Sequence, residues 1–258
     1  MEVGMYLRSG VCAVVAALLW GLCASCVEAG SLTLAGGQAV LQEKGRARPL
    51  PSGVFQVEKA AHAPFWYVLV GKEEAARYGL QAGVHLFHDD GTAAGVAAMA
   101  DPGVCGDVYL SPNKQHVLVD NGTWLVRDLL VYSYPRMEAA PKAIITYVSS
   151  EASAPLWLDD EKLLYTTIRE TSARSCDYDL CGPLSASVFS LRSGREAVVK
   201  RGDDLCDYWA LRAERGRAVV GVRCLRRVED WKQEPSGTPV REISVEVHEA
   251  RVPVKSGR

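Results

Sequence analysis

The sequence lacks the short motifs that mark the common catalytic and nucleotide-binding sites. It has no Gly-x-Ser-x-Gly element, which positions a nucleophilic serine, and no cysteine lies in a recognisable catalytic signature. Gly36-Gly37 is not followed by Lys and Ser or Thr, and no Gly-x-Gly-x-x-Gly occurs, so phosphate-binding glycine loops are also missing. We therefore expect neither a catalytic residue nor a cofactor.

Charge of one sign is not concentrated in either half of the chain. The 29 Lys and Arg residues nearly balance the 31 Asp and Glu residues, for a formal net charge of −2. Phosphate backbones require a concentrated positive face, so we do not expect a nucleic-acid partner. A hydrophobic fraction of 48% and a charged fraction of 23% indicate a globular chain rather than a disordered one.

The sequence also has no long hydrophobic run. The uncharged stretch 9–27 has an apolar centre at 11–22, which matches a signal-peptide core of about 7–15 residues. It is short for a span of ~30 Å of hydrocarbon. Val27 and Ala29 stand at positions −3 and −1 of an acceptable cleavage site. We predict that residues 1–29 are a secretory signal peptide and that the protein is periplasmic or secreted.

Two alternatives would tether the protein to a membrane. An uncleaved N-terminal helix would act as an anchor. Cys26 would instead carry a lipid, because Ala24-Ser25-Cys26 supplies the small residues of such a site. Against lipidation, Cys23 stands where bacterial lipoproteins usually have Leu.

Cysteines are few in the mature chain. Three of the eight lie within residues 1–29, which leaves Cys105, Cys176, Cys181, Cys206 and Cys224. In an oxidising compartment we expect disulfides. Cys176 and Cys181 would close a short loop, and Cys105 would be free and buried or would pair with another chain. A metal site is the alternative, although the paired Cys-x-x-Cys spacing of structural zinc sites is absent.

Cys206 and Cys224 fit facing positions of one predicted hairpin, with strands at 207–212 and 218–223. A turn centred on residue 215 places Asp207 opposite Arg223, a favourable cross-strand charge pair. The predicted pairs are Cys206 with Cys224, Asp207 with Arg223, Tyr208 with Val222, and Ala210 with Val220. We therefore predict a Cys206–Cys224 disulfide.

Helical periodicity is confined to 72–80. We predict one short helix there, capped by Gly79. Elsewhere short runs of Val, Leu, Ile, Tyr and Thr alternate with Gly, Pro, Asn and Asp, which is typical of strands and turns. Asp120-Asn121-Gly122 is predicted to form one of the hairpin turns. Four segments of about 45–55 residues each open with an apolar, aromatic-rich strand. These segments are 63–106, 107–152, 153–206 and 207–255.

The segment 110–119 (Leu-Ser-Pro-Asn-Lys-Gln-His-Val-Leu-Val) resembles the strand–Ser-Pro-Asp-Gly-Lys–strand signature of TolB-like bacterial β-propellers, which are WD-repeat-like proteins of the periplasm. Segment 156–165 resembles a degenerate second copy, and 188–196 resembles the outer hairpin of such a blade. The usual turn glycine is absent from both copies, and only about four repeats fit. The resemblance implies an all-β fold, a small β-propeller of about four blades, with a β-sandwich or barrel as the alternative.

The predicted organisation has four parts. Residues 1–29 are the signal peptide, 30–60 an N-terminal arm or tether that carries strands at most, 61–255 the propeller-like repeat domain, and 256–258 a frayed tail.

One short segment combines the residue types of a metal site: His85, His88, Asp89 and Asp90. On a strand, positions i and i+3 point to opposite faces, so a turn after a strand explains this cluster better than a bound ion. We therefore expect no metal, and keep these four residues as low-ranking ligand candidates.

Three functions compete. The first is a non-catalytic protein-binding or scaffolding module of the bacterial envelope, with an envelope protein as its partner. The second is a periplasmic propeller enzyme, a hydrolase or quinoprotein-like, whose loop residues Asp89, Asp160 and Asp204 converge. The third is a structural secreted domain. The first is favoured by the predicted export, the propeller resemblance and the missing catalytic motifs.

Overall fold

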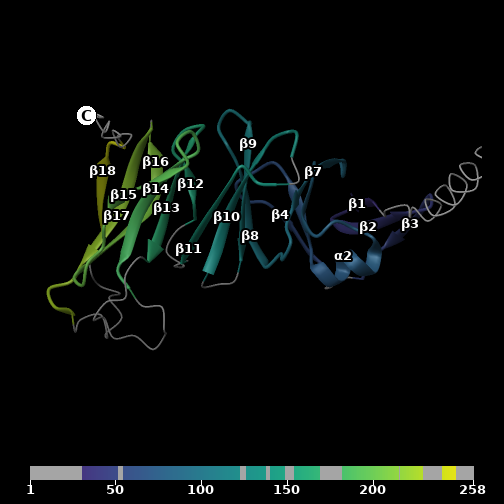
Figure 1. Cartoon of the computed structure of the whole chain (residues 1–258), viewed down its shortest axis with the longest axis horizontal. Coiled ribbons are helices and arrows are strands. Elements are labelled where there is room, and N and C mark those ends of the chain that lie inside the picture. The colour runs from purple at the N-terminus through teal and green to yellow at the C-terminus, as the bar shows by residue number, and fades with distance from the viewer. Residues whose placement is uncertain are drawn as a thin grey trace, which may run out of the picture.

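The computed structural model describes residues 31–51, 55–122, 126–137, 140–148, 154–168, 182–214, 216–228 and 240–247. Within these residues the chain is all-β, with five small antiparallel sheets and one short helix. The sheets follow one another in chain order and stand in a row, with β1–β3 and β16–β18 at opposite ends (Figure 1).

Each sheet is built from strands that are consecutive in sequence. The first sheet contains β1 (Ser31–Ala35), β2 (Gln38–Glu43) and β3 (Arg46–Pro49); the second β4 (Gln56–Lys59), β5 (Trp66–Val70), β6 (Gly83–Phe87) and β7 (Ala93–Ala98); the third β8 (Val104–Leu110), β9 (His116–Gly122), β10 (Val126–Ser133) and β11 (Ala143–Val148); the fourth β12 (Leu156–Trp157), β13 (Lys162–Ile168), β14 (Leu184–Ser190) and β15 (Arg195–Lys200); and the fifth β16 (Cys206–Glu214), β17 (Arg217–Cys224) and β18 (Arg241–Val245).

The row is held together by apolar side chains on both faces of the inner sheets. Successive residues of a strand point to opposite faces, so Val68 contacts the first sheet while its neighbour Tyr67 faces the third. The joining residues include Leu32, Leu41, Val68 and Phe87 between the first and second sheets; Tyr67, Leu86, Val108 and Val119 between the second and third; Leu118, Leu129, Leu163 and Tyr165 between the third and fourth; and Leu164, Val188, Ala210 and Val220 between the fourth and fifth.

The outer face of the fifth sheet is polar, as expected of the last unit in a stack. Ala210 and Val220 point inward, so Trp209 and Gly221 face away from the fourth sheet. The indole of Trp209 lies over Gly221, where a Cβ atom would come within 2.3 Å of the ring. Arg212 Nη2 lies 2.7 Å from Glu242 Oε2, which links β16 to β18 across this end of the molecule.

The predicted hairpin and its disulfide are confirmed. All four predicted residue pairs are present in the register of β16 and β17, and Cys206 is bonded to Cys224. The register shifts by one residue between Ala210 and Arg212, so the hairpin contains a bulge that the sequence did not reveal. The helix is also confirmed: α2 (Lys72–Tyr78) is closed by Gly79 in the left-handed conformation at φ 63°.

The predicted arm at 30–60 is more structured than the sequence suggested. It forms the three strands of the first sheet and then β4, the first strand of the second sheet. The reason is its short apolar pattern, because Leu32, Leu34 and Leu41 are buried against the second sheet. The predicted repeats 107–152, 153–206 and 207–255 correspond to the third, fourth and fifth sheets, so the described chain has five units where four were predicted.

Neither a closed barrel nor a two-sheet sandwich is formed by the described strands, because no sheet order returns to its own first strand and five separate sheets are present. No helix of the described residues is long and apolar enough to cross a membrane. The Cys206–Cys224 disulfide is compatible with a periplasmic or secreted location. The predicted signal peptide, Cys26, Cys176, Cys181 and the frayed tail lie outside the described residues.

Candidate functional site

The four low-ranking ligand candidates do not converge on one point. His85 is buried in β6, and its Nε2 lies 2.7 Å from the carbonyl oxygen of Gln81. His88 packs against the ring of Phe65 at 5.8 Å between centroids. Asp89 forms an ion pair with Lys59.

Asp90 stabilises the turn that follows β6. Its Oδ1 accepts hydrogen bonds from the backbone nitrogen of Thr92 at 2.9 Å and from the Thr92 hydroxyl at 2.6 Å. This arrangement is the predicted strand followed by a turn. Among the described residues, no group of three or more His, Cys, Asp or Glu side chains is placed to hold a metal ion.

The acidic residues of the enzyme hypothesis belong to different sheets. Asp89 follows β6 of the second sheet, Asp160 lies between β12 and β13 of the fourth, and Asp204 precedes the fifth. Asp160 contacts the third sheet, because its Oδ1 accepts a hydrogen bond from the backbone nitrogen of Asn113, between β8 and β9, at 2.8 Å. The three carboxylates therefore do not form a common site.

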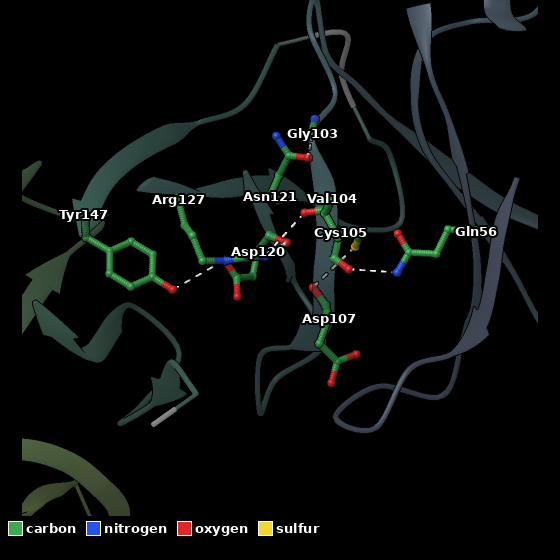
Figure 2. A network of polar contacts seen from close by, with 9 residues as sticks. All are labelled: Gln56, Gly103, Val104, Cys105, Asp107, Asp120, Asn121, Arg127 and Tyr147. Carbon is green, nitrogen blue, oxygen red and sulfur yellow. Dashed lines mark hydrogen bonds and ion pairs between the residues drawn. The ribbon is translucent and has the colours of Figure 1, made fainter. Parts of the chain in front are cut away.

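The densest polar cluster of the described residues lies in the third sheet (Figure 2). Arg127 Nε donates to Asp120 Oδ1 at 2.7 Å, and Nη2 donates to the carbonyl oxygens of Asp120 at 3.1 Å and Val104 at 3.4 Å. The hydroxyl of Tyr147 donates to Asp120 Oδ1 at 3.4 Å. Both charged side chains are only 10% exposed, so this is a buried ion pair.

A bulge in β8 brings the backbone close to this ion pair. The register between β8 and β9 shifts between Cys105 and Asp107, which leaves Gly106 as the extra residue. A Cβ atom on Gly106 would lie 2.4 Å from Arg127 Nη2 and 2.8 Å from Asp120 Oδ2. A side chain at position 106 would therefore displace the two charged groups, which the bulge covers directly.

The thiol of Cys105 is buried beside the same cluster and forms no disulfide. Its Sγ lies 3.8 Å from the carbonyl oxygen of Asp107. Burial, reinforced by the negative charge of Asp120, raises the pKa of the Cys105 thiol far above its usual value. Because the thiolate is the reactive form, this cysteine is an inert packing residue.

The network continues into the second sheet through Gln56 of β4. Its Nε2 donates to the carbonyl oxygen of Cys105 at 2.9 Å and to the hydroxyl of Tyr67 at 3.3 Å. Tyr67 in turn donates to Glu58 Oε2 at 2.8 Å. Burial, with the hydrogen bond to Glu58, raises the pKa of Tyr67 well above the ordinary range. The cluster thus fixes how the second and third sheets sit against each other.

The contacts of Asp120, Arg127 and Tyr147 are those of a structural cluster rather than of a catalytic site. Burial raises the pKa of Asp120, and the hydrogen bond and charge of Arg127 oppose that rise. The carboxylate, guanidinium and phenol are engaged with one another, and the thiol is protonated. A nucleophile or general base needs a free reactive lone pair near a substrate, and none of these groups offers one.

The polar cluster of the third sheet was not predicted from the sequence. The sequence predicted a turn at Asp120-Asn121-Gly122, which is wrong, because β9 continues through Gly122 and pairs with both neighbouring strands. Asn121 remains in the strand since its Oδ1 accepts a hydrogen bond from the backbone nitrogen of Gly103 at 3.1 Å. Polar residues that usually mark a turn are here satisfied inside a sheet.

Comparison with known proteins gives a limited result. No protein-family model and no curated protein matches the chain. Among solved structures, the chain is similar to one from a structural and mechanistic study of two prolyl endopeptidases and their inter-domain dynamics, at 14% identity and a TM-score of 0.34. The match covers 76% of this chain and 29% of that chain. A likeness this low identifies neither the fold nor an activity.

Proposed function

We propose that the protein is an exported, non-catalytic protein-binding module of the bacterial envelope, built from propeller-type blades. The blade interpretation is supported by the consecutive antiparallel sheets of three or four strands and by the TolB-like segment 110–119. The absence of catalysis is supported by the closed arrangement of the Asp120–Arg127 cluster.

The observation that carries the proposal is the edge strand β11 of the third sheet. The sheet order is β11-β10-β9-β8, so one side of β11 has no partner strand among the described residues. Its sequence, Ala-Ile-Ile-Thr-Tyr-Val, contains no charge and no proline, and its pairing with β10 has no bulge. Natural edge strands normally carry a charge, a proline or a bulge, because each of these prevents pairing with another chain.

Two other edge strands are better protected. The edge strand β3 reads Arg-Ala-Arg-Pro, and the edge strand β15 begins with Arg-Glu and ends with Lys. On β11, in contrast, the side chain of Ile144 is 57% exposed. A partner segment would add to β11 as a further strand, with backbone hydrogen bonds for affinity and Ile144 as an apolar contact.

The test is crosslinking in intact cells followed by affinity purification of the tagged protein from the envelope fraction. The wild type should recover one stoichiometric envelope protein, and Ile144→Lys should lose it because a charge on the edge disfavours strand addition. Val240→Lys is the matched control, since Val240 is also exposed, at 47%, and precedes β18 at the far end of the row. Equal recovery with wild type and Ile144→Lys would exclude β11 as the binding edge.

A further inference from the structure

A cluster of cations marks the end of the molecule where the predicted export segment joins the first sheet. We call Lys44, Arg46, Arg48 and Arg77 the basic edge. Lys44 lies in the turn between β2 and β3, Arg46 and Arg48 on the edge strand β3, and Arg77 in the last turn of α2. We propose that the basic edge docks on the anionic phospholipid headgroups of a membrane.

The positive charge of the basic edge is not neutralised internally. Within the described part of the chain, no ion pair engages any of its four residues. Glu43, Lys44, Arg46 and Arg48 line one open hollow, and Arg48 and Arg77 line the adjoining one beside Tyr78. Glu43 is thus the single acidic residue that lines either hollow.

The side chains are held in place rather than scattered. Arg46 and Arg48 are two positions apart on a strand, so they lie on the same face about 7 Å apart. The guanidinium of Arg48 lies 5.6 Å from the centre of the Tyr78 ring, a cation–π contact between β3 and α2. The contact keeps Arg48 beside Arg77, the next residue to Tyr78 on the helix.

The turn that carries Lys44 is unusual. Lys44 and Gly45 connect paired residues Glu43 and Arg46, and both have positive φ, at 50° and 72°. A two-residue turn of this type favours Asn, Asp or Gly at its first central position. Lysine is disfavoured there by its backbone, so we assign its presence to a role of its side chain.

The location of the basic edge identifies the occupant. Ser31, the first residue of β1, pairs with Gln42, only two positions from Lys44. The described chain therefore begins beside the basic edge, and the predicted export brings this end of the chain to a membrane surface. Clusters of Lys and Arg close to a membrane surface favour anionic lipid headgroups.

Protection of the edge strand is the simpler explanation of the charges on β3. That explanation needs charge but not a particular sign, because Glu and Lys both discourage strand addition. Lipid docking needs positive charge. Reversing the sign without removing the charge therefore separates the two explanations, and the test does not depend on the partner proposed for β11.

The experiment uses the exported form of the chain, purified as the cell processes it, and flotation with two vesicle types. One contains 30% phosphatidylglycerol in phosphatidylcholine, and the other is pure phosphatidylcholine. Each cation near an anionic surface adds roughly fivefold to the binding constant. We expect at least tenfold tighter binding to the anionic vesicles, and we expect this preference to weaken at 0.5 M NaCl.

The decisive variant is Lys44→Glu, Arg46→Glu, Arg77→Glu, which leaves the Arg48–Tyr78 contact intact. It should lower binding to the anionic vesicles by about a hundredfold. The control is Arg136→Glu, Lys142→Glu, Arg195→Glu, three exposed cations elsewhere with the same change in net charge. Unchanged binding by the first variant, an equal loss in both, or equal affinity of the wild type for the two vesicle types would overturn the proposal.

Discussion

The buried ion pair of the third sheet gives the sharpest prediction. Arg127→Met removes the guanidinium but keeps much of the side-chain volume, which leaves the Asp120 carboxylate without its charged partner. Loss of one member of a buried pair typically costs about 3–5 kcal/mol. Since both side chains are 10% exposed and three hydrogen bonds from Arg127 are lost, we expect the change to lie in that range.

The assay is urea unfolding followed by tryptophan fluorescence. With a slope of about 2–3 kcal/mol per M, the midpoint should fall by roughly 1–2.5 M. The loss of unfolding free energy caused by Arg127→Met should be smaller at pH 5 than at pH 8. Burial already raises the pKa of Asp120, and without Arg127 it rises further, so the folded variant binds a proton more tightly than the unfolded chain. Its stability therefore decreases as pH rises through the pKa of the folded state.

The matched control is Arg212→Met on the outer face of the fifth sheet. Arg212 also contacts a carboxylate, that of Glu242, but both side chains are about half exposed. Exposed pairs of this kind contribute little because water screens them. Equal effects of Arg127→Met and Arg212→Met, or an Arg127→Met effect independent of pH, would show that the Asp120 carboxylate is not sealed from solvent.

Two further predictions concern the disulfide and the buried histidines. The Cys206→Ser, Cys224→Ser variant should lose about 3 kcal/mol of unfolding free energy, the chain-entropy value for a closed loop with a separation of 18 residues, and a reducing agent should destabilise the wild type equally. Unchanged thermal unfolding after reduction would contradict this. Burial lowers the pKa of His85 and of His116, so their contribution to stability is complete above about pH 6.5 and is lost as pH falls below it. His85→Gln, whose amide can still donate to Gln81, should flatten the fall in melting temperature between pH 6.5 and 5; an unchanged pH profile would assign that fall to other groups.

The parts of the fold that were predictable are those in which local pattern and tertiary packing agree. The hairpin of β16 and β17 has alternating inward Ala and Val residues, a complementary Asp207–Arg223 pair and cysteines at facing ends. Every local signal favours the same register, so the Cys206–Cys224 pairing followed from the predicted hairpin register and the Asp207–Arg223 pair. The same agreement holds for β9 and β13, whose apolar runs reflect burial on both faces.

The unpredicted strands have weak local signals and depend on their neighbours. β3 contains two arginines and a proline and is exposed along its length, so only pairing with β2 makes it a strand. β7 is rich in alanine, which has low strand propensity, and is held by β6. Sequence pattern detects strands that bury apolar side chains, and it missed β3 and β7, whose stability comes from one backbone ladder.

The turn after β8 adopts a left-handed conformation at a residue that is not glycine. Lys114 stands where the TolB-like signature has glycine, and it adopts the left-handed conformation at φ 58° that glycine would take freely. Ser111 supports the turn, because its hydroxyl accepts hydrogen bonds from the backbone nitrogens of Gln115 and His116. The backbone geometry is thus retained by side-chain hydrogen bonds.

The buried polar residues of the third sheet differ in their contacts from the residues at the exposed sheet edges. Asp120, Arg127 and Tyr147 satisfy one another inside the third sheet and leave nothing for a substrate. Two exposed features lie at edges instead: the apolar strand β11 on the third sheet and the basic residues around β3 on the first. These two edges differ in chemistry and lie on different sheets, so the two proposed contacts, with an anionic surface and with an added strand, do not compete for one site. In the proposed scaffold function, binding at these edges leaves the packed interior undisturbed.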